Sequence, residues 1–115
     1  MPRPSKATEV VSDAALGSLR AFGARLREAR LRRNWTQALT AGKAGLSESS
    51  VKKAETGSPN ISTAAYVALL DVYGLPTALD TLLAPGSDAI GEAMQRASGR
   101  QRARAPAAEA DEWDL

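Results

Sequence analysis

The 115-residue sequence predicts an all-α protein with five helices, preceded by a flexible N-terminal arm and followed by a C-terminal tail. Apolar residues recur at three- and four-residue steps in several segments, which is the pattern of an amphipathic helix. Serine or threonine stands before these segments, where a hydroxyl caps the first free amides of a helix. Glycine or proline follows them, where helices commonly end. The predicted parts are an arm over residues 1–12, a helical domain over 13–84 and a tail over 85–115.

The first predicted helix begins at Ser12 or Asp13 and ends near Arg33. Its buried stripe consists of Leu16, Leu19, Phe22, Leu26 and Ala29. Its other face is unusually basic and carries Arg20, Arg25, Arg27, Arg30, Arg32 and Arg33. Such a face is either a solvated surface or a surface that lies along nucleic-acid phosphates.

Two short helices, one ending at Ala44 and one over 48–55, follow in the stretch from Trp35 to Gly57. Gly45 stands where the first must end in a left-handed backbone, which glycine adopts without steric penalty. Ser47 is placed to cap the second. A turn this short makes the helices cross steeply, so that the second projects outward.

The second short helix sorts into two faces. Val51 and Ala54 point to the core, three residues apart. The remaining positions face solvent or a ligand, and they are Glu48, Ser49, Ser50, Lys52 and Lys53.

These residues carry a family resemblance. The spacing of Thr36-Gln37, Ala41, Ala44-Gly45-Leu46-Ser47, Val51, Glu55 and Gly57 resembles the helix-turn-helix of the Cro, lambda-repressor and XRE regulators. The wider runs RNWTQ, AGLSESSVKKAE and NISTAAYVALLDVYGL are similar to HipB-type antitoxins, which partner HipA kinase toxins and repress their own operons. The resemblance implies a five-helix lambda-repressor-like DNA-binding domain. It also implies a repressor that autoregulates its operon and acts as the antitoxin of a HipA-like kinase toxin.

The DNA-binding residues follow from this resemblance and from the face of the outward helix. They are Arg27, Arg30, Gln37, Ser47, Glu48, Ser49, Ser50, Lys52 and Lys53. In the resembled family, a glutamine at the position of Gln37 holds a phosphate oxygen and braces the next helix. A glutamate such as Glu48 can accept from cytosine N4, whereas serine reads bases with little selectivity. Lys52 and Lys53 are better placed for phosphates than for bases.

The chain departs from the family pattern in the first short helix. Thr40 stands where leucine is usual, and Gly42 lies in the helix interior, where glycine costs up to about 1 kcal/mol relative to alanine. Leu39 is expected to turn inward in compensation, with a small change of register.

The segment after Pro59 predicts a helix capped by Ser62 or Thr63 and ending near Tyr73, then a short helix from Pro76. The latter carries Leu79, Leu82 and Leu83, which is more apolar surface than a small domain hides. A homodimer is therefore expected, with a complete monomer core as the alternative.

Residues 84–87, Ala-Pro-Gly-Ser, mark the boundary between the helical domain and the tail. The tail's thin apolar stripe over 90–97 predicts a helix formed only against a partner, and residues 98–106 are expected to lack structure alone. Trp113 and Leu115 lie among four acidic residues near the end, and they are the predicted anchor for the kinase toxin.

Composition excludes several other classes. The chain has no cysteine and no histidine, so that the usual zinc ligands and the usual general base are missing. We therefore expect no enzyme, no metal and no cofactor. Without a signal peptide or a transmembrane run, a soluble cytoplasmic protein is expected, with no membrane partner.

Charge is unevenly distributed along the chain. Residues 1–57 carry eleven Lys or Arg against five Asp or Glu, and residues 58–115 carry four against eight. Double-stranded operator DNA is the partner that a basic front half favours. Two alternatives remain: a protein-interaction module of the same fold with weak DNA reading, and a stand-alone or phage-type XRE regulator without a toxin.

Overall fold

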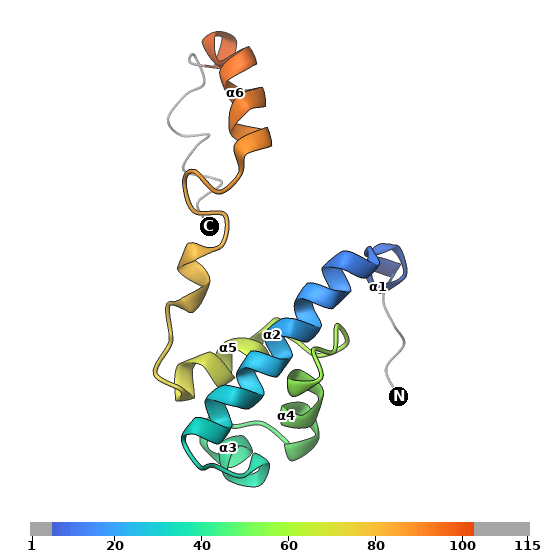
Figure 1. Cartoon of the computed structure of the whole chain (residues 1–115), viewed down its shortest axis with the longest axis vertical. Coiled ribbons are helices and arrows are strands. Elements are labelled where there is room, and N and C mark those ends of the chain that lie inside the picture. Colours follow the sequence, from blue (N-terminus) through green and yellow to red (C-terminus); the bar gives the residue numbers. More distant parts are fainter. Residues whose placement is uncertain (1–5, 103–115) are drawn as a thin grey trace. The chain divides into compact units, whose positions relative to one another are not determined.

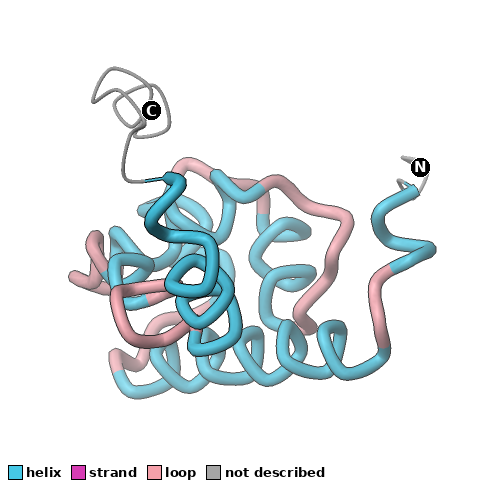
Figure 2. The backbone as a smooth tube through the Cα atoms, turned by 90° about the horizontal axis from the view of Figure 1, so that it is seen from above, coloured by secondary structure: helices cyan, strands magenta, loops and turns pink. Residues whose placement is uncertain are grey.

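The structure, a computed structural model, describes residues 6–102, and all regular elements in that range are helices, with no strand among them (Figure 2). The helices are α1 (Lys6–Val10), α2 (Asp13–Arg32), α3 (Gln37–Ala44), α4 (Glu48–Glu55), α5 (Thr63–Val72) and α6 (Ala89–Arg102), with a short 3-10 helix η1 (Ala78–Thr81). The predicted all-α fold is confirmed. The chain divides into two compact units, Met1–Ala78 and Leu79–Leu115. No helix within 6–102 is long and apolar enough to cross a membrane.

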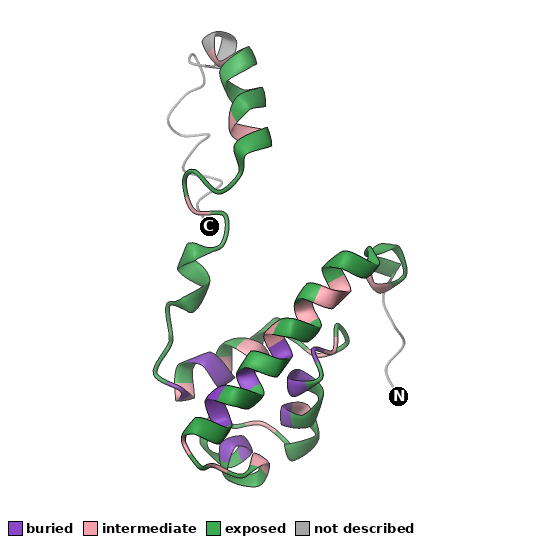
Figure 3. Cartoon of the chain, viewed as in Figure 1, coloured by how far each residue is buried: buried purple, intermediate pink, exposed green. Residues whose placement is uncertain are grey.

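In the first unit, the long helix α2 runs as a rod beside α3, α4 and α5 (Figure 1). Figure 3 shows that burial on α2 is confined to its C-terminal half, which contributes Leu26 and Ala29 to the core. The hydrophobic core consists of Leu26, Ala29, Ala41, Val51, Ala54, Leu69, Leu70 and Tyr73. This core holds the two short helices of the motif on one rigid base.

Serine and threonine hydroxyls cap the four main helices of this unit. Ser12, Thr36, Ser47 and Ser62 each accept a hydrogen bond from a backbone amide in the first turn. At the other end of α3, Gly45 has a φ of 70° and its amide donates to the carbonyl of Ala41. The predicted caps and the predicted glycine turn are therefore confirmed, and they fix where α4 begins.

Two glycines allow α2 and the end of α4 to touch backbone to backbone. A Cβ on Gly23 would lie 2.5 Å from the amide nitrogen of Gly57. A Cβ on Gly57 would lie 2.5 Å from the Cα of Arg20. Neither distance is possible for a real side chain, so this crossing requires glycine both within α2 and just after α4. It sets the spacing between α4 and the basic helix.

The predicted inward turn of Leu39 is wrong. The side chain of Leu39 is 47% exposed, whereas Thr40 is fully buried. The Thr40 hydroxyl donates to the carbonyl of Thr36 at 2.9 Å, so that its polar group is satisfied inside α3. Because threonine can be buried in this way, the helix keeps its register and needs no compensation from Leu39.

The ends of the chain differ from the sequence expectations. Helix α1 occupies part of the predicted flexible arm. Helix α6 reaches Arg102, although a helix there was expected only against a partner and residues 98–106 were expected to lack structure. Asp88 starts α6 by accepting from the amide of Gly91, which is a cap that the apolar stripe alone does not reveal. Trp113 and Leu115 lie outside the described residues.

Candidate nucleic-acid interface

Helix α4 has one buried face and one polar face. Val51 and Ala54 have no exposed surface. On the opposite side Glu48, Ser49, Lys52 and Lys53 are exposed, and Ser50 is half-buried. Ser47, also exposed, caps the helix. The structure thus brings the predicted residues of α4 together on one outward surface, as the sequence indicated.

A buried polar network joins three helices behind this surface. The carboxylate of Glu55 accepts from Arg30 Nε at 2.6 Å, from Arg30 Nη2 at 3.1 Å and from Gln37 Nε2 at 3.0 Å. Arg30 also donates to the carbonyl of Trp35 at 2.9 Å. The hydrogen bonds that Arg30 donates to Glu55 raise the pKa of the Arg30 guanidinium. The network fixes α4 against both α2 and α3.

Arg30 is therefore not a DNA contact, and this part of the prediction is wrong. Arg30 is only 7% exposed, and its three hydrogen bonds all go to acceptors inside the protein, two to Glu55 and one to the Trp35 carbonyl. The sequence shows an arginine on a basic helix, but it does not show that Glu55 lies opposite across the core. Burial without such a partner would be unfavourable for a guanidinium.

A family model described as "Helix-turn-helix domain" matches residues 21–82. The chain belongs to this family. The match begins within α2 and ends just after η1, so it includes the whole of α3, the Gly45 turn and α4. A search of curated proteins gives no match. In the terms of this family, the outward helix α4 is the recognition helix of a DNA-binding regulator.

The N-terminal turn of the recognition helix carries its own contacts. The hydroxyls of Ser47 and Ser50 lie 2.9 Å apart and form a hydrogen bond. Glu48 Oε2 lies 3.6 Å from Lys52 Nζ, one turn along the helix. Both side chains of this pair are exposed, and such surface pairs contribute little, so a nucleic acid can separate them at small cost. Ser49, in the same turn, is exposed.

Gln37 lies at the first position of α3 and is half-buried. One of its amide hydrogens is directed to Glu55. An amide nitrogen carries two hydrogens, so the second remains available for a phosphate oxygen. The predicted bracing of the next helix is thus visible in this bond, and the phosphate contact stays a prediction.

The arginines of α2 divide between two flanks of the helix. At about 100° per residue, Arg20 and Arg27 share one side and Arg25 and Arg32 share another. The first side adjoins α4, because the backbone at Arg20 meets Gly57. The second adjoins α5, where Arg25 and Arg32 line a groove with residues of that helix. Arg27, exposed on the α4 flank, remains a candidate phosphate contact, and Arg20 joins it.

Trp35 lies at the junction of α2 and α3, as predicted. Its ring centroid is 5.8 Å from that of Tyr73, and Lys43 Nζ lies 4.8 Å from its centroid. Trp35 thus packs against the hydrophobic core through Tyr73, next to the start of α3.

The sequence reading missed the contact of Gly23 with Gly57. The available signal was a glycine in the middle of a long helix, which is unfavourable unless a close approach requires it.

Proposed function

We propose that this helix-turn-helix protein is a sequence-specific DNA-binding repressor whose recognition helix α4 enters the major groove. The observation that carries the proposal is the exposed polar face of α4 on a braced base. That face presents a carboxylate and a hydroxyl near the N-terminal end and two lysines toward the C-terminal end. N-terminal residues of such a helix meet base edges, while cations one turn later reach the phosphates.

The proposed division of labour assigns reading to Glu48 and Ser49 and affinity to Gln37, Arg27 and Lys53. Each phosphate that a cation neutralises releases counterions, so that the observed affinity falls with salt by roughly 0.9 logarithmic units per contact. A bidentate base contact is worth about 1–3 kcal/mol of discrimination. Ser49 has a single hydroxyl, which supports modest specificity.

The test is a salt titration on the DNA directly upstream of the chain's own reading frame, with a shuffled duplex of equal composition beside it. We expect a specific complex that weakens steeply with salt. The variant carrying Gln37→Ala and Ser49→Ala together should lose about tenfold in affinity. Its circular dichroism should be unchanged. Arg25→Ala is the matched control, because Arg25 lies on the other flank of α2, and it should bind like the parent chain.

Equal and feeble binding to both duplexes would contradict the proposal. That result would favour the second candidate, a protein-interaction module of the same fold. Glu48 supports this candidate, because its carboxylate places a negative charge at the end of α4 that should read bases.

The finer part of the proposal is that the repressor is an XRE-type antitoxin that autoregulates its operon in the cytoplasm. It would act on a HipA-like kinase toxin, with Trp113 and Leu115 as the anchor. Its support is the resemblance of the residue runs given above. Trp113→Ala should weaken binding to such a kinase and leave DNA affinity intact. Equal loss of both would contradict separate surfaces, and no change in kinase binding would remove the anchor role.

Homodimerisation belongs to the same proposal. Leu82 and Leu83 in the second unit are 66% and 83% exposed, which supports an apolar contact between copies. Sedimentation of the parent chain should show a dimer, and Leu82→Glu with Leu83→Glu should give a monomer. A parent chain that sediments as a monomer would contradict this part.

A further inference from the structure

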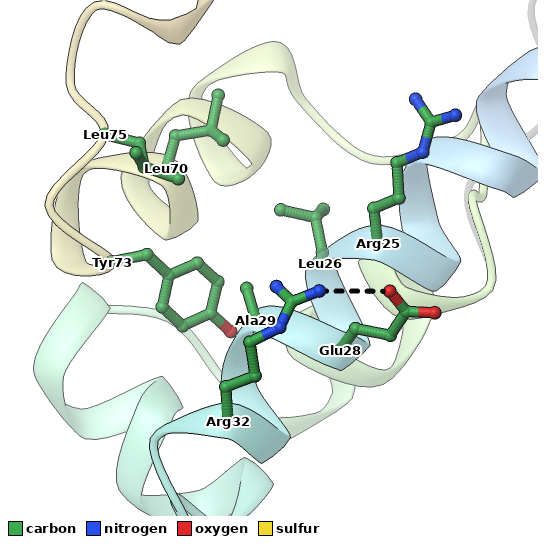
Figure 4. Close-up of a pocket in the computed structure, with 8 residues that line it drawn as sticks. All are labelled: Arg25, Leu26, Glu28, Ala29, Arg32, Leu70, Tyr73 and Leu75. Carbon is green, nitrogen blue, oxygen red and sulfur yellow. Dashed lines mark hydrogen bonds and ion pairs between the residues drawn. The ribbon is translucent and has the colours of Figure 1, made fainter.

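A groove lies on the flank of α2 that is turned toward α5 (Figure 4). Its apolar surface comes from Leu26, Ala29, Leu70, Tyr73 and Leu75, and its polar rim from Arg25, Glu28 and Arg32. The volume is about 250 Å³. Small-molecule sites are commonly larger, about 300–1,000 Å³, so this groove suits a single apolar side chain better than a whole ligand.

The groove is built on fixed backbone. Helix α5 ends with Leu75 donating to the carbonyl of Leu70 at 2.8 Å and Gly74 donating to that of Asp71 at 3.0 Å. This pair of bonds is the Schellman arrangement, which places Leu75 against Leu70 as one wall. The wall is thus present before any partner binds.

Arg33 holds Tyr73 in place. Arg33 donates to the Tyr73 carbonyl at 2.7 Å, and its guanidinium carbon lies 5.1 Å from the ring centroid. The ring is buried, and turning it out of the groove would break its contacts with the Arg33 guanidinium and with the Trp35 ring. A preformed pocket loses little conformational entropy on binding.

The rim of the groove carries two positive side chains, Arg25 and Arg32, and one negative side chain, Glu28. Arg32 Nη2 lies 3.4 Å from Glu28 Oε2, and the two side chains are 69% and 60% exposed. An exposed pair of this kind contributes little, so Arg32 can change partners at small cost. Within residues 6–102 no ion pair to Arg25 is formed. Neither arginine lies on the flank next to α4, so DNA on the recognition helix does not engage them.

We propose that this groove docks an acidic segment of a partner protein. One leucine-sized or aromatic side chain enters the apolar floor, and flanking carboxylates pair with Arg25 and Arg32. A nucleic acid fits less well, because its phosphates could pair with the arginines of the rim but would leave the mainly apolar floor of Leu26, Leu70 and Leu75 uncovered. A second copy in a two-fold contact would place the same arginines against each other, which is unfavourable.

The first test uses fluorescence anisotropy with a labelled nine-residue peptide that carries four carboxylates around one tryptophan. The full-length protein should bind it. The double variant Arg25→Ala with Arg32→Ala should bind about tenfold more weakly. The matched control is Arg20→Ala with Arg27→Ala, which removes the same charge from the other flank of α2 and should stay within about twofold of the parent. Equal losses in the two variants would overturn the site, because they would report net charge only.

The second test concerns the apolar floor. Leu75→Ala opens one wall without touching a charge, and Leu75 is exposed enough to be replaced without unfolding the core. It should weaken the peptide several-fold, as should replacing the peptide's tryptophan by alanine. Urea unfolding of the variant checks that its fold persists. The proposal would be overturned if neither Leu75→Ala nor the loss of the peptide's tryptophan weakened binding. It would also be overturned if the peptide did not bind the parent chain.

Two further measurements separate this inference from the proposed function. The variant Arg25→Ala with Arg32→Ala should bind the upstream DNA as tightly as the parent does. Because peptide binding is measured without DNA, a parent chain that failed to bind DNA would still test the groove. Sedimentation should show the same oligomeric state for parent and variant. Self-association that the two substitutions abolish would overturn the proposal in favour of a second copy in the groove.

Discussion

Removing Arg30 should destabilise the domain more than removing any other arginine of α2. The pair of Arg30 with Glu55 is buried, with side-chain exposures of 9% and 4%. In Arg30→Met the carboxylate of Glu55 remains inside the protein without its cation, and breaking a buried pair from one side costs about 3–5 kcal/mol. The Trp35 carbonyl also loses its donor. Since small domains are stable by about 5–15 kcal/mol, this is a large share of the total.

Urea unfolding at neutral pH measures this loss as a lower midpoint at an unchanged slope. Arg27→Met is the matched control, one turn earlier on the same helix and exposed, and it should stay within about 0.5 kcal/mol of the parent. Arg30→Met combined with Glu55→Leu leaves no charge stranded, so it should recover much of the loss. If Arg30→Met unfolds at the same urea concentration as Arg27→Met, the network does not hold the motif together and the reasoning is refuted.

Two substitutions and one titration test the packing further. Gly42→Ala meets open space on the outside of α3, so it should raise stability by up to about 1 kcal/mol; a lower urea midpoint would contradict this. In Gly57→Ala the new Cβ would push α2 away from the end of α4, and alanine would have to adopt the left-handed φ of 71° that Gly57 has. This variant should lose about 1–3 kcal/mol of stability. Stability equal to that of the parent would contradict the close contact. Burial raises the pKa of Tyr66 and of Tyr73 above the ordinary value of 10.0. The folded state then binds more protons than the unfolded state at alkaline pH, so the stability present below pH 10 should fall as pH rises through the folded values. Absorbance at 295 nm follows both tyrosines, and titration at the ordinary pKa in the native chain would contradict their burial.

The sequence predicted the helices because their signals are local. A hydroxyl at Ser47 and a glycine at Gly45 act within a few residues, so cap and turn can be read along the chain. The amphipathic stripes likewise place Val51 inward. The fate of Arg30 depends on Glu55, 25 residues away, and no local pattern reports that distance.

Two other differences have the same origin. Thr40 satisfies its hydroxyl within α3, which a comparison of side-chain size with leucine does not anticipate. The meeting of Gly23 with Gly57 depends on how two helices cross, so it is visible only in three dimensions. Site residues on one short helix could therefore be predicted together, whereas the sorting of the α2 arginines could not.

The two flanks of α2 lead to a last prediction, that DNA and an acidic partner bind at the same time. They use different arginines, Arg20 and Arg27 on one side and Arg25 and Arg32 on the other, so neither ligand displaces the other directly. An acidic peptide and DNA still repel each other through the helix, whose diameter with side chains is about 10–12 Å. At 0.15 M salt the screening length is about 8 Å, and the repulsion across that span is mostly screened.

At 0.01 M salt the screening length is about 30 Å, so the repulsion should become visible. The labelled peptide should therefore bind the DNA complex almost as tightly as the free protein at 0.15 M salt, and clearly more weakly than the free protein at 0.01 M. An uncharged peptide of the same length, in which amides replace the carboxylates, serves as the control for direct overlap. Complete displacement of the acidic peptide by DNA at 0.15 M salt would mean that the two ligands share a surface, and the assignment of the arginines to separate flanks would then be wrong.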